Sequence, residues 1–191
     1  MKSVKGTQTE KNLLMTFAGE SQARMRYTYW ARVAEKEGYQ QIAAIFLETA
    51  DQEKEHAKRM FKFLEGGDVE ITGAYPAGQI RSTLENLDEA AKGEEHEYRD
   101  LYPACAEMAE KEGFPEIAQM YRAVIVAEIF HGNRYRALQE NIKKDRVFKR
   151  DIPKKWRCRK CGYVHEGLEA PEVCPACLHP QAYYEIAAEN Y

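Results

Sequence analysis

Apolar residues recur at steps of three and four over most of the first 144 residues, which is the spacing of one face of an α-helix. Four such stretches predict four long helices. The first runs from about Lys11 to Lys36, and the others begin near Tyr39, Gln79 and Pro115. Because the apolar stripes are one-sided, the four helices are expected to pack around a shared core.

The breaks between these stretches predict how the helices connect. Gly38 and Gly113 mark tight turns, so helices one and two, and three and four, form antiparallel hairpins. The interval 66–78 begins with two glycines and is long enough to run the length of a bundle. Two hairpins joined by one long crossover make a mainly α, ferritin-like four-helix bundle. Pro103 lies inside the third pattern, where a proline can kink a helix.

The two predicted hairpins are related by an internal repeat. The segment 34–43, AEKEGYQQIA, recurs as AEKEGFPEIA at 109–118, an offset of 75. Gly19 and Glu20 recur as Gly93 and Glu94 at an offset of 74, so one residue is gained between the two blocks. The bundle therefore resembles a duplicated helical hairpin.

Six ionisable residues interrupt the apolar stripes at positions that periodicity assigns to the core. They are Glu20, Glu53, His56, Glu94, Glu128 and His131. A single buried carboxylate could be a satisfied core group, but six that match between repeats require a compensating positive charge. No Lys or Arg recurs on those stripes, so we expect metal ions to supply it.

The spacing of these residues fits a site for two metal ions. Glu53 and His56, like Glu128 and His131, are three residues apart and share one helix face. One Glu from each of two helices and a Glu-x-x-His pair from each of the other two is the ligand set of ferritin-like di-iron and di-manganese proteins. Mixed oxygen and imidazole ligands suit iron or manganese better than a structural zinc.

Three further bundle residues have two readings each. Glu97 lies three residues after Glu94, so it could reach the same metals or be a solvated surface acid. Tyr27 and Tyr102 could hydrogen-bond ligating carboxylates or simply fill the core.

Cys105 stands alone on an apolar stripe and is read as a small core residue.

A second metal site is predicted near the C-terminus. Cys158 and Cys161, and Cys174 and Cys177, form two Cys-x-x-Cys knuckles. Four thiolates at this spacing hold one zinc or iron ion tetrahedrally, and the spacing alone does not choose between them. A domain of under forty residues needs such a metal to fold.

Composition and the lengths of the apolar runs limit the domain organisation, the cellular location and the partners that we expect. We expect the bundle over residues 1–144, a linker over 145–154 and the cysteine domain over 155–191. No apolar run approaches the length of a membrane span, and the start of the chain does not read as a signal peptide, so we expect a cytoplasmic protein. The formal net charge of −3 indicates no nucleic-acid partner.

With both sites in view, the whole chain resembles rubrerythrin, in which a ferritin-like di-iron domain is fused to a rubredoxin-like domain. The resemblance rests on Glu20, the two Glu-x-x-His pairs, Glu94-x-x-Glu97 and the paired cysteine knuckles. It implies a carboxylate-bridged pair of iron ions in the bundle and one iron on four cysteines. In two respects the second metal site departs from rubredoxins: Leu178 stands where glycine is usual, and the loop between knuckles is short.

The resemblance also implies a function. The family reduces hydrogen peroxide to water in oxidative stress defence, with electrons that pass from an external donor, such as rubredoxin or a reductase, through the cysteine-bound iron. It implies that one iron exchanges His56 for Glu97 as the pair is oxidised, and that Tyr27 and Tyr102 support the ligands. Family members act as homodimers, with the cysteine domain of one subunit near the di-iron site of the other.

Two rival functions stay open. A ferroxidase or iron-storage protein would use the same bundle ligands, but it would not need a built-in electron relay. A zinc-ribbon adaptor without enzymatic activity would explain the cysteines, but it would leave the buried glutamates unexplained.

Overall fold

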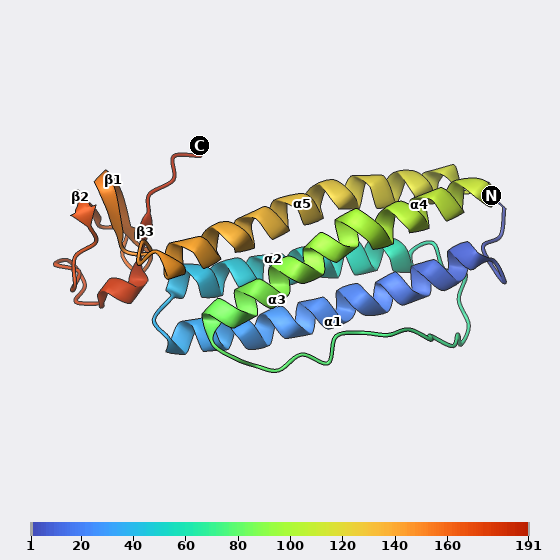
Figure 1. The fold of residues 1–191 in the computed structure, drawn as a ribbon, viewed down its shortest axis with the longest axis horizontal. Coiled ribbons are helices and arrows are strands. Elements are labelled where there is room, and N and C mark those ends of the chain that lie inside the picture. The colour runs from blue at the N-terminus through green and yellow to red at the C-terminus, as the bar shows by residue number, and fades with distance from the viewer. Residues whose placement is uncertain (1, 191) are drawn as a thin grey trace.

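The computed structural model describes residues 2–190 and shows four long rods with a small sheet at one end (Figure 1). Helices α1 (Gln8–Lys36) and α2 (Gln40–Phe61) form the first hairpin. In the second hairpin, one rod combines α3 (Thr83–His96), the π-helical η1 (Glu97–Leu101) and α4 (Tyr102–Lys111), and the other is α5 (Pro115–Lys143). Residues 62–82 cross over along the bundle, so the predicted mainly α bundle with one long crossover is confirmed.

The starts of the helices follow from capping side chains. The Thr7 hydroxyl accepts a hydrogen bond from the Glu10 backbone N–H at the start of α1. Ser82 and Glu85 form a capping box that fixes the start of α3 at Thr83. The prediction that this helix begins near Gln79 was therefore wrong, and Ile80 lies in the crossover with its side chain 61% exposed.

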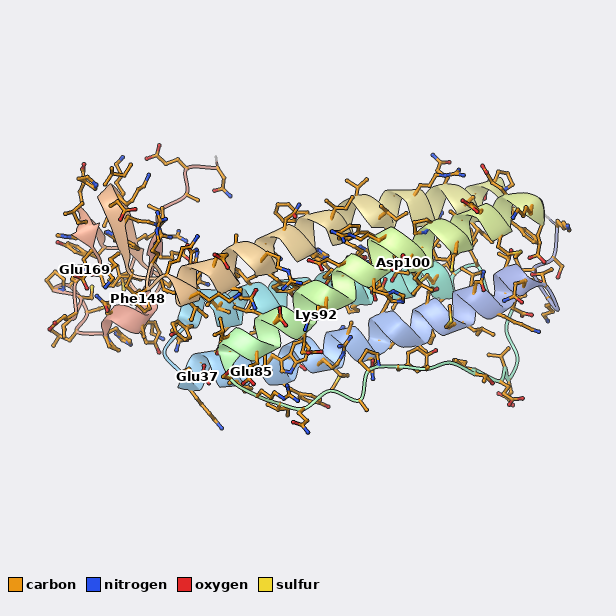
Figure 2. The ribbon with its side chains drawn as sticks, viewed as in Figure 1. Glu37, Glu85, Lys92, Asp100, Phe148 and Glu169 are labelled. Atoms are coloured by element: carbon orange, nitrogen blue, oxygen red, sulfur yellow. The ribbon has the colours of Figure 1, made fainter. Side chains whose placement is uncertain are left out.

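Hydrogen bonds at positions related by the internal repeat connect the two hairpins. Glu112, in the turn of the second hairpin, accepts hydrogen bonds from the backbone N–H (2.7 Å) and the hydroxyl (2.6 Å) of Thr9 on α1. Its repeat equivalent Glu37, labelled in Figure 2 close to Glu85, accepts one from the Thr83 N–H on α3 at 3.0 Å. Each turn therefore caps the other hairpin's first helix by satisfying backbone N–H groups that the helix itself leaves free.

Two apolar cores fill the bundle and leave a polar layer between them. One core, nearer the cysteine domain, includes Trp30, Phe46 and Tyr135. The other, toward the opposite end, includes Leu13, Met60 and Tyr121. The carboxylates and imidazoles singled out above come from the helix positions between these cores, so water is kept away from them on both sides. Cys105 is buried in the second core, as predicted.

The C-terminal domain is a three-stranded antiparallel sheet in the order β2–β1–β3. Its strands are β1 (Lys149–Cys158), β2 (Val164–Glu169) and β3 (Tyr184–Ile186), with the short helix η2 (Gln181–Tyr183) before the last. Since β1 begins at Lys149, part of the predicted linker 145–154 is ordered strand. Trp156 is fully buried and donates its indole N–H to the Gly167 carbonyl at 3.0 Å.

The cysteine domain rests on the end of the bundle where α5 ends. The ring of Phe148, which also packs on the domain's core, stacks on Tyr39 with centroids 6.4 Å apart. Within residues 2–190, no helix combines the length and apolar character that a membrane crossing requires.

Candidate metal centres

The six predicted ionisable residues converge in the middle of the bundle. Glu20 comes from α1, Glu53 and His56 from α2, Glu94 from α3, and Glu128 and His131 from α5. The four carboxylates and His131 are at most 3% exposed, whereas the His56 side chain is 16% exposed. The cluster is therefore almost fully buried, and His56 is the most exposed of its six residues.

The converging side chains form two overlapping groups of ligand atoms. Glu20, Glu53, His56 and Glu128 make up one group, and Glu53, Glu94, Glu128 and His131 make up the other, each with its atoms within 4.8 Å of one another. Glu53 and Glu128 belong to both groups. Two metal ions held here would share these two carboxylates as bridges, while Glu20 and Glu94 would each serve one metal.

Each imidazole presents its Nδ1 atom to the carboxylates. His56 Nδ1 lies 2.9 Å from an oxygen of Glu53 and 2.9 Å from an oxygen of Glu128. His131 Nδ1 lies 2.8 Å from the other oxygen of Glu128. The same nitrogen on each ring could bind a metal once it has lost its proton.

Crowding of negative charge controls protonation in the metal-free cluster. Burial, followed by repulsion from Glu53 and Glu128, raises the pKa of Glu20 well above its usual range, and burial and Glu53 do the same to the pKa of Glu94. Burial lowers the pKa of His56, but its hydrogen bonds with Glu128 and Glu53 outweigh this and raise it to about 10. Without metal, both carboxyls and the imidazole therefore tend to hold protons.

The surroundings of four buried carboxylate oxygens show whether metal ions fit this cluster. One carboxylate oxygen on each of Glu20, Glu53 and Glu94 is buried without any hydrogen-bond partner, and the corresponding oxygen of Glu128 has only the His56 Nδ1, at 2.9 Å. In the part of the chain that the structure describes, the only cationic side chains in ion pairs with these four residues are His56 and His131. Buried oxygens without partners on three helices, beside a fourth that only an imidazole contacts, are a costly arrangement that hard metal ions would satisfy.

Both predicted tyrosines contact this carboxylate layer. Tyr102 donates its hydroxyl to Glu20 at 2.5 Å, and Tyr27 donates to Glu94. Burial first, and then the neighbouring carboxylate, raises the pKa of each tyrosine well above 10, so both keep their protons. Each tyrosine therefore orients the carboxylate that belongs to one group only.

Glu97 lies beside the two groups but belongs to neither. It is partly exposed, and loss of solvent followed by repulsion from Glu94 raises its pKa. Glu97 begins the π-helical segment η1, and Pro103 follows shortly after. This segment absorbs the residue gained between the repeats, because Glu94 follows Glu20 by 74 positions and Tyr102 follows Tyr27 by 75. The rod continues past Pro103 as α4, so the proline does not end it.

Sequence reasoning missed two residues that shape the site. A Cβ added at Gly132 would lie 3.3 Å from the Glu94 Cβ, so this glycine lets α5 approach α3 closely. A glycine directly after a candidate ligand, inside a helical pattern, was the available signal. The second is Arg26, whose charge lowers the pKa of Glu97 against the stronger effects of burial and Glu94. Nothing in the apolar periodicity pointed to it.

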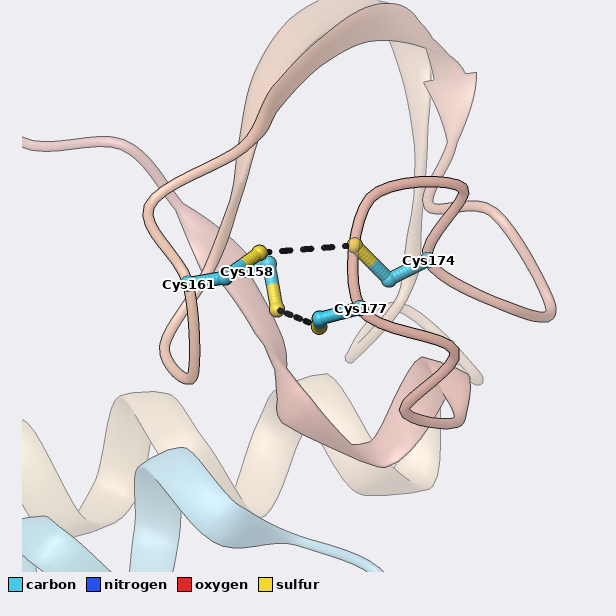
Figure 3. Close-up of side chains that lie close together, drawn as sticks. All are labelled: Cys158, Cys161, Cys174 and Cys177. Carbon is cyan, nitrogen blue, oxygen red and sulfur yellow. Dashed lines mark hydrogen bonds between the residues drawn. The ribbon is translucent and has the colours of Figure 1, made fainter.

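The four C-terminal cysteines gather into one compact cluster (Figure 3). The Sγ atoms of Cys158 and Cys177 are 3.8 Å apart, and those of Cys161 and Cys174 are 3.7 Å apart. Four sulfurs bound to one ion at about 2.3 Å in a tetrahedron would be about 3.8 Å apart. None of the cysteines is in a disulfide, so the cluster fits a single metal ion.

The two knuckles differ in the residue that follows the second cysteine. Gly162 has a φ of 81° after Cys161, and Leu178 has a φ of 60° after Cys177. Both donate a backbone N–H to the carbonyl of the first cysteine of their knuckle, at 2.9 Å. Leu178 therefore has a strained backbone, since a residue with a side chain in this region costs about 1–2 kcal/mol.

Comparison with known proteins decides which family the chain belongs to. The Rubrerythrin family model matches residues 11–139, and the model for the rubredoxin-like domain of rubrerythrin matches residues 156–185. The chain belongs to the rubrerythrin family. It is 57% identical over 191 residues to a rubrerythrin of Nitratidesulfovibrio vulgaris, with all of both chains covered. It is 59% identical over 190 residues to one of Porphyromonas gingivalis, covering 100% of this chain and 95% of that one.

A solved structure supports the same assignment. Nigerythrin in its fully reduced, all-ferrous state superimposes with a TM-score of 0.65 at 32% identity, covering 97% of this chain and 92% of that one. In this rubrerythrin-family chain, the two buried groups fit a carboxylate-bridged pair of iron ions, and the cysteine cluster fits a rubredoxin-like iron site.

The shared carboxylates give a first prediction. Glu128→Ala removes an oxygen ligand from both groups, so the bundle should lose both of its iron ions. Glu20→Ala removes a ligand of one group only and should leave about one. Iron content per chain, measured after anaerobic reconstitution and desalting, checks both, with the exposed Glu55→Ala as the matched control. Equal iron loss in the Glu20 and Glu128 variants would contradict the bridging arrangement.

The protonated imidazoles give a second prediction. His56, with a pKa of about 10, and His131, raised to about 12 by Glu128 and Glu53 against the effect of burial, keep their protons at neutral pH without metal. Iron needs both Nδ1 lone pairs and the ionised carboxylates of Glu20 and Glu94, so filling the bundle expels at least two protons. The product of the two Fe(II) binding constants should therefore rise at least roughly 100-fold per pH unit in the neutral range.

Anaerobic titration calorimetry in two buffers of different ionisation enthalpy counts the expelled protons. The Glu128→Ala variant, expected to fill only its cysteine site, supplies the background. Affinity of the bundle for Fe(II) that does not change between pH 6 and pH 8 would contradict the protonation scheme.

Proposed function

We propose that this rubrerythrin-family chain is a non-haem di-iron peroxidase that reduces hydrogen peroxide to water in oxidative stress defence. The observation that carries the proposal is the pairing of two metal sites of different chemistry in one chain. The bundle offers oxygen and imidazole ligands, and the small domain offers four thiolates. Storage or oxidation of iron needs only the first site, whereas repeated reduction of peroxide needs electrons resupplied through the second.

The reaction adds two electrons and two protons to hydrogen peroxide and releases two water molecules. When bound, a reduced iron pair supplies the two electrons, and the cysteine-bound iron returns them one at a time. Glu53 and Glu128, which belong to both ligand groups, would hold the two metals together. Tyr102 and Tyr27 fix the carboxylates of Glu20 and Glu94 through their hydrogen bonds, so these two ligands cannot rotate when the charge of the pair changes.

Glu97 and His56 are the ligands that we propose to alternate. His56 belongs to one metal group, and Glu97 lies close enough to Glu94 and Glu128 to be repelled by them. An anionic oxygen is the better ligand for more oxidised iron, and a neutral imidazole suffices for ferrous iron. Since Glu97 stands where the helix changes from α to π geometry, its side chain is not locked into the regular helix packing.

Electron delivery favours a homodimer. In one chain, twelve residues of α5 separate His131 from Lys143, a length of about 18 Å, and the cysteine domain begins only beyond that end. A cavity of about 720 Å³ between α2 and α5 reaches His56 and is lined also by Arg59, Glu116 and Met120. We propose that the cysteine domain of a second copy lies near this opening, and that a rubredoxin or a reductase supplies the electrons.

The test of the peroxidase proposal is a stopped-flow experiment on the fully reduced, iron-loaded protein. Mixing with hydrogen peroxide should restore the visible absorption of oxidised thiolate-bound iron quickly, and mixing with oxygen should restore it at least tenfold more slowly. The Glu97→Ala variant should lose most of the fast peroxide phase, and Glu95→Ala, which alters a neighbouring surface acid, should retain it.

The rival functions make different predictions in the same measurement. A faster reaction with oxygen, together with assembly into a large shell, would replace the peroxidase by a ferroxidase or storage protein. Thiolate-bound iron absorption that fails to appear with either oxidant would leave a zinc-ribbon adaptor.

A further inference from the structure

A carboxylate next to the cysteine cluster is buried between two guanidinium groups. Glu185 on β3 is only 6% exposed. One of its oxygens accepts a hydrogen bond from Arg157 and the other from Arg159, both on or directly after β1. The side chains of the two arginines are 49% and 30% exposed, so the pairings lie at the edge of the domain's core.

The register of the sheet places this triad beside a metal ligand. Arg157 is the cross-strand partner of Glu185, and Cys158 is the cross-strand partner of Tyr184. Neighbouring strands lie about 4.8 Å apart and residues rise about 3.3 Å along a strand, so the Glu185 backbone lies diagonally opposite that of Cys158, about 6 Å away. The two arginines flank Cys158 in sequence on both sides. Side chains alternate along a strand, so Arg157 and Glu185 lie on the opposite face of the sheet from Cys158. At this short separation a change of charge in the triad is expected to act on the cysteine-bound metal through the thickness of the sheet.

Stability alone is a weak reason for such a triad. Burying ions costs solvation free energy, and replacing a buried ion pair by apolar residues is often neutral or stabilising. The triad has two positive charges and one negative charge, which leaves one net positive charge beside the thiolates. Among the charged side chains bonded in this triad, Glu185 alone is negative.

We propose that Glu185 is a positioning residue that holds down the reduction potential of the cysteine-bound iron, an inference that rests on the electron-relay function proposed above. Four thiolates with ferric iron have a net charge of −1, and one added electron makes it −2. Arg157 and Arg159 stabilise the reduced form, and Glu185 offsets part of that effect and fixes where the two guanidinium groups lie. The relay thus remains able to pass its electron onward to the iron pair.

The net charge left in the triad decides whether each variant raises or lowers the midpoint potential of the cysteine-bound iron. Glu185→Gln leaves two uncompensated positive charges and should raise the midpoint potential, with a three- to tenfold change in the equilibrium constant for reduction, or about 30–60 mV at 59 mV per tenfold. Arg159→Gln should lower the potential, and the double variant should lie close to the unmodified protein. Glu185→Asp, which keeps the charge, should recover most of the original value.

The measurement is an anaerobic spectroelectrochemical titration of the full-length, iron-loaded protein, followed through the visible absorption of the thiolate-bound iron. The matched control is Glu189→Gln, which removes an exposed acid that pairs with Lys155 in the same domain. Its potential should stay within a few millivolts of the original, because exposed charges are screened by solvent and salt.

A purely structural role for Glu185 predicts other results. A potential that is unchanged in Glu185→Gln, or that moves in the same direction in Glu185→Gln and Arg159→Gln, would overturn the proposal. If Glu185→Gln fails to retain iron, Arg157→Gln and Arg159→Gln still test the charge effect, since each should lower the potential. No peroxide is present in the titration, so a failure of the peroxidase proposal would be seen separately.

Discussion

Unbalanced negative charge in a dry interior is the constraint on which the rest of this structure depends. Four glutamates from four helices meet between two apolar cores, and three of them keep one oxygen without a hydrogen-bond partner. Two imidazoles and two tyrosine hydroxyls satisfy only part of the hydrogen-bonding capacity of these four carboxylates. The bundle is therefore built around positive charge that its own side chains do not provide, and a pair of iron ions satisfies that requirement.

The duplication of a helical hairpin explains how such a site is assembled with few special residues. Each half provides a single Glu, a Glu-x-x-His pair and a supporting Tyr, and the pseudo-symmetry makes the central carboxylates common to both metal groups. The halves are not identical, because one residue gained in the second half is absorbed by the π-helical segment that starts at Glu97. That asymmetry places an additional carboxylate, Glu97, beside the two metal groups.

Much of this could be predicted from the sequence, since periodicity and charge are both local signals. Glu53 and His56 lie on an apolar stripe, which places them in the core whatever the details of packing. The spacing of the two Cys-x-x-Cys knuckles is likewise enough to predict a metal site with four sulfur ligands. The start of the third helix was wrong because local chemistry there competes with periodicity, and secondary structure inside the predicted linker was not anticipated. The capping box at Ser82 overrides an apolar Ile80 at the start of α3, and strand β1 begins inside the predicted linker.

Other features depend on contacts between distant segments. The close approach at Gly132, the charge of Arg26 near Glu97 and the pairing of Glu185 with two arginines all depend on how helices or strands lie against each other. No pattern within one element reveals them. The position of Glu97 beside both metal groups, but inside neither, likewise follows from the π-helical geometry rather than from its three-residue spacing to Glu94.

The central claim is that one chain holds an iron pair on the buried carboxylates and a separate iron on the cysteines. Mössbauer spectroscopy of the protein reconstituted with ⁵⁷Fe and oxidised tests it most directly, because it counts iron by chemical environment. The account predicts two iron ions in a spin-coupled oxygen and nitrogen environment for every one in a sulfur environment. A spectrum with sulfur-bound iron alone, or with uncoupled iron in the bundle, would contradict it.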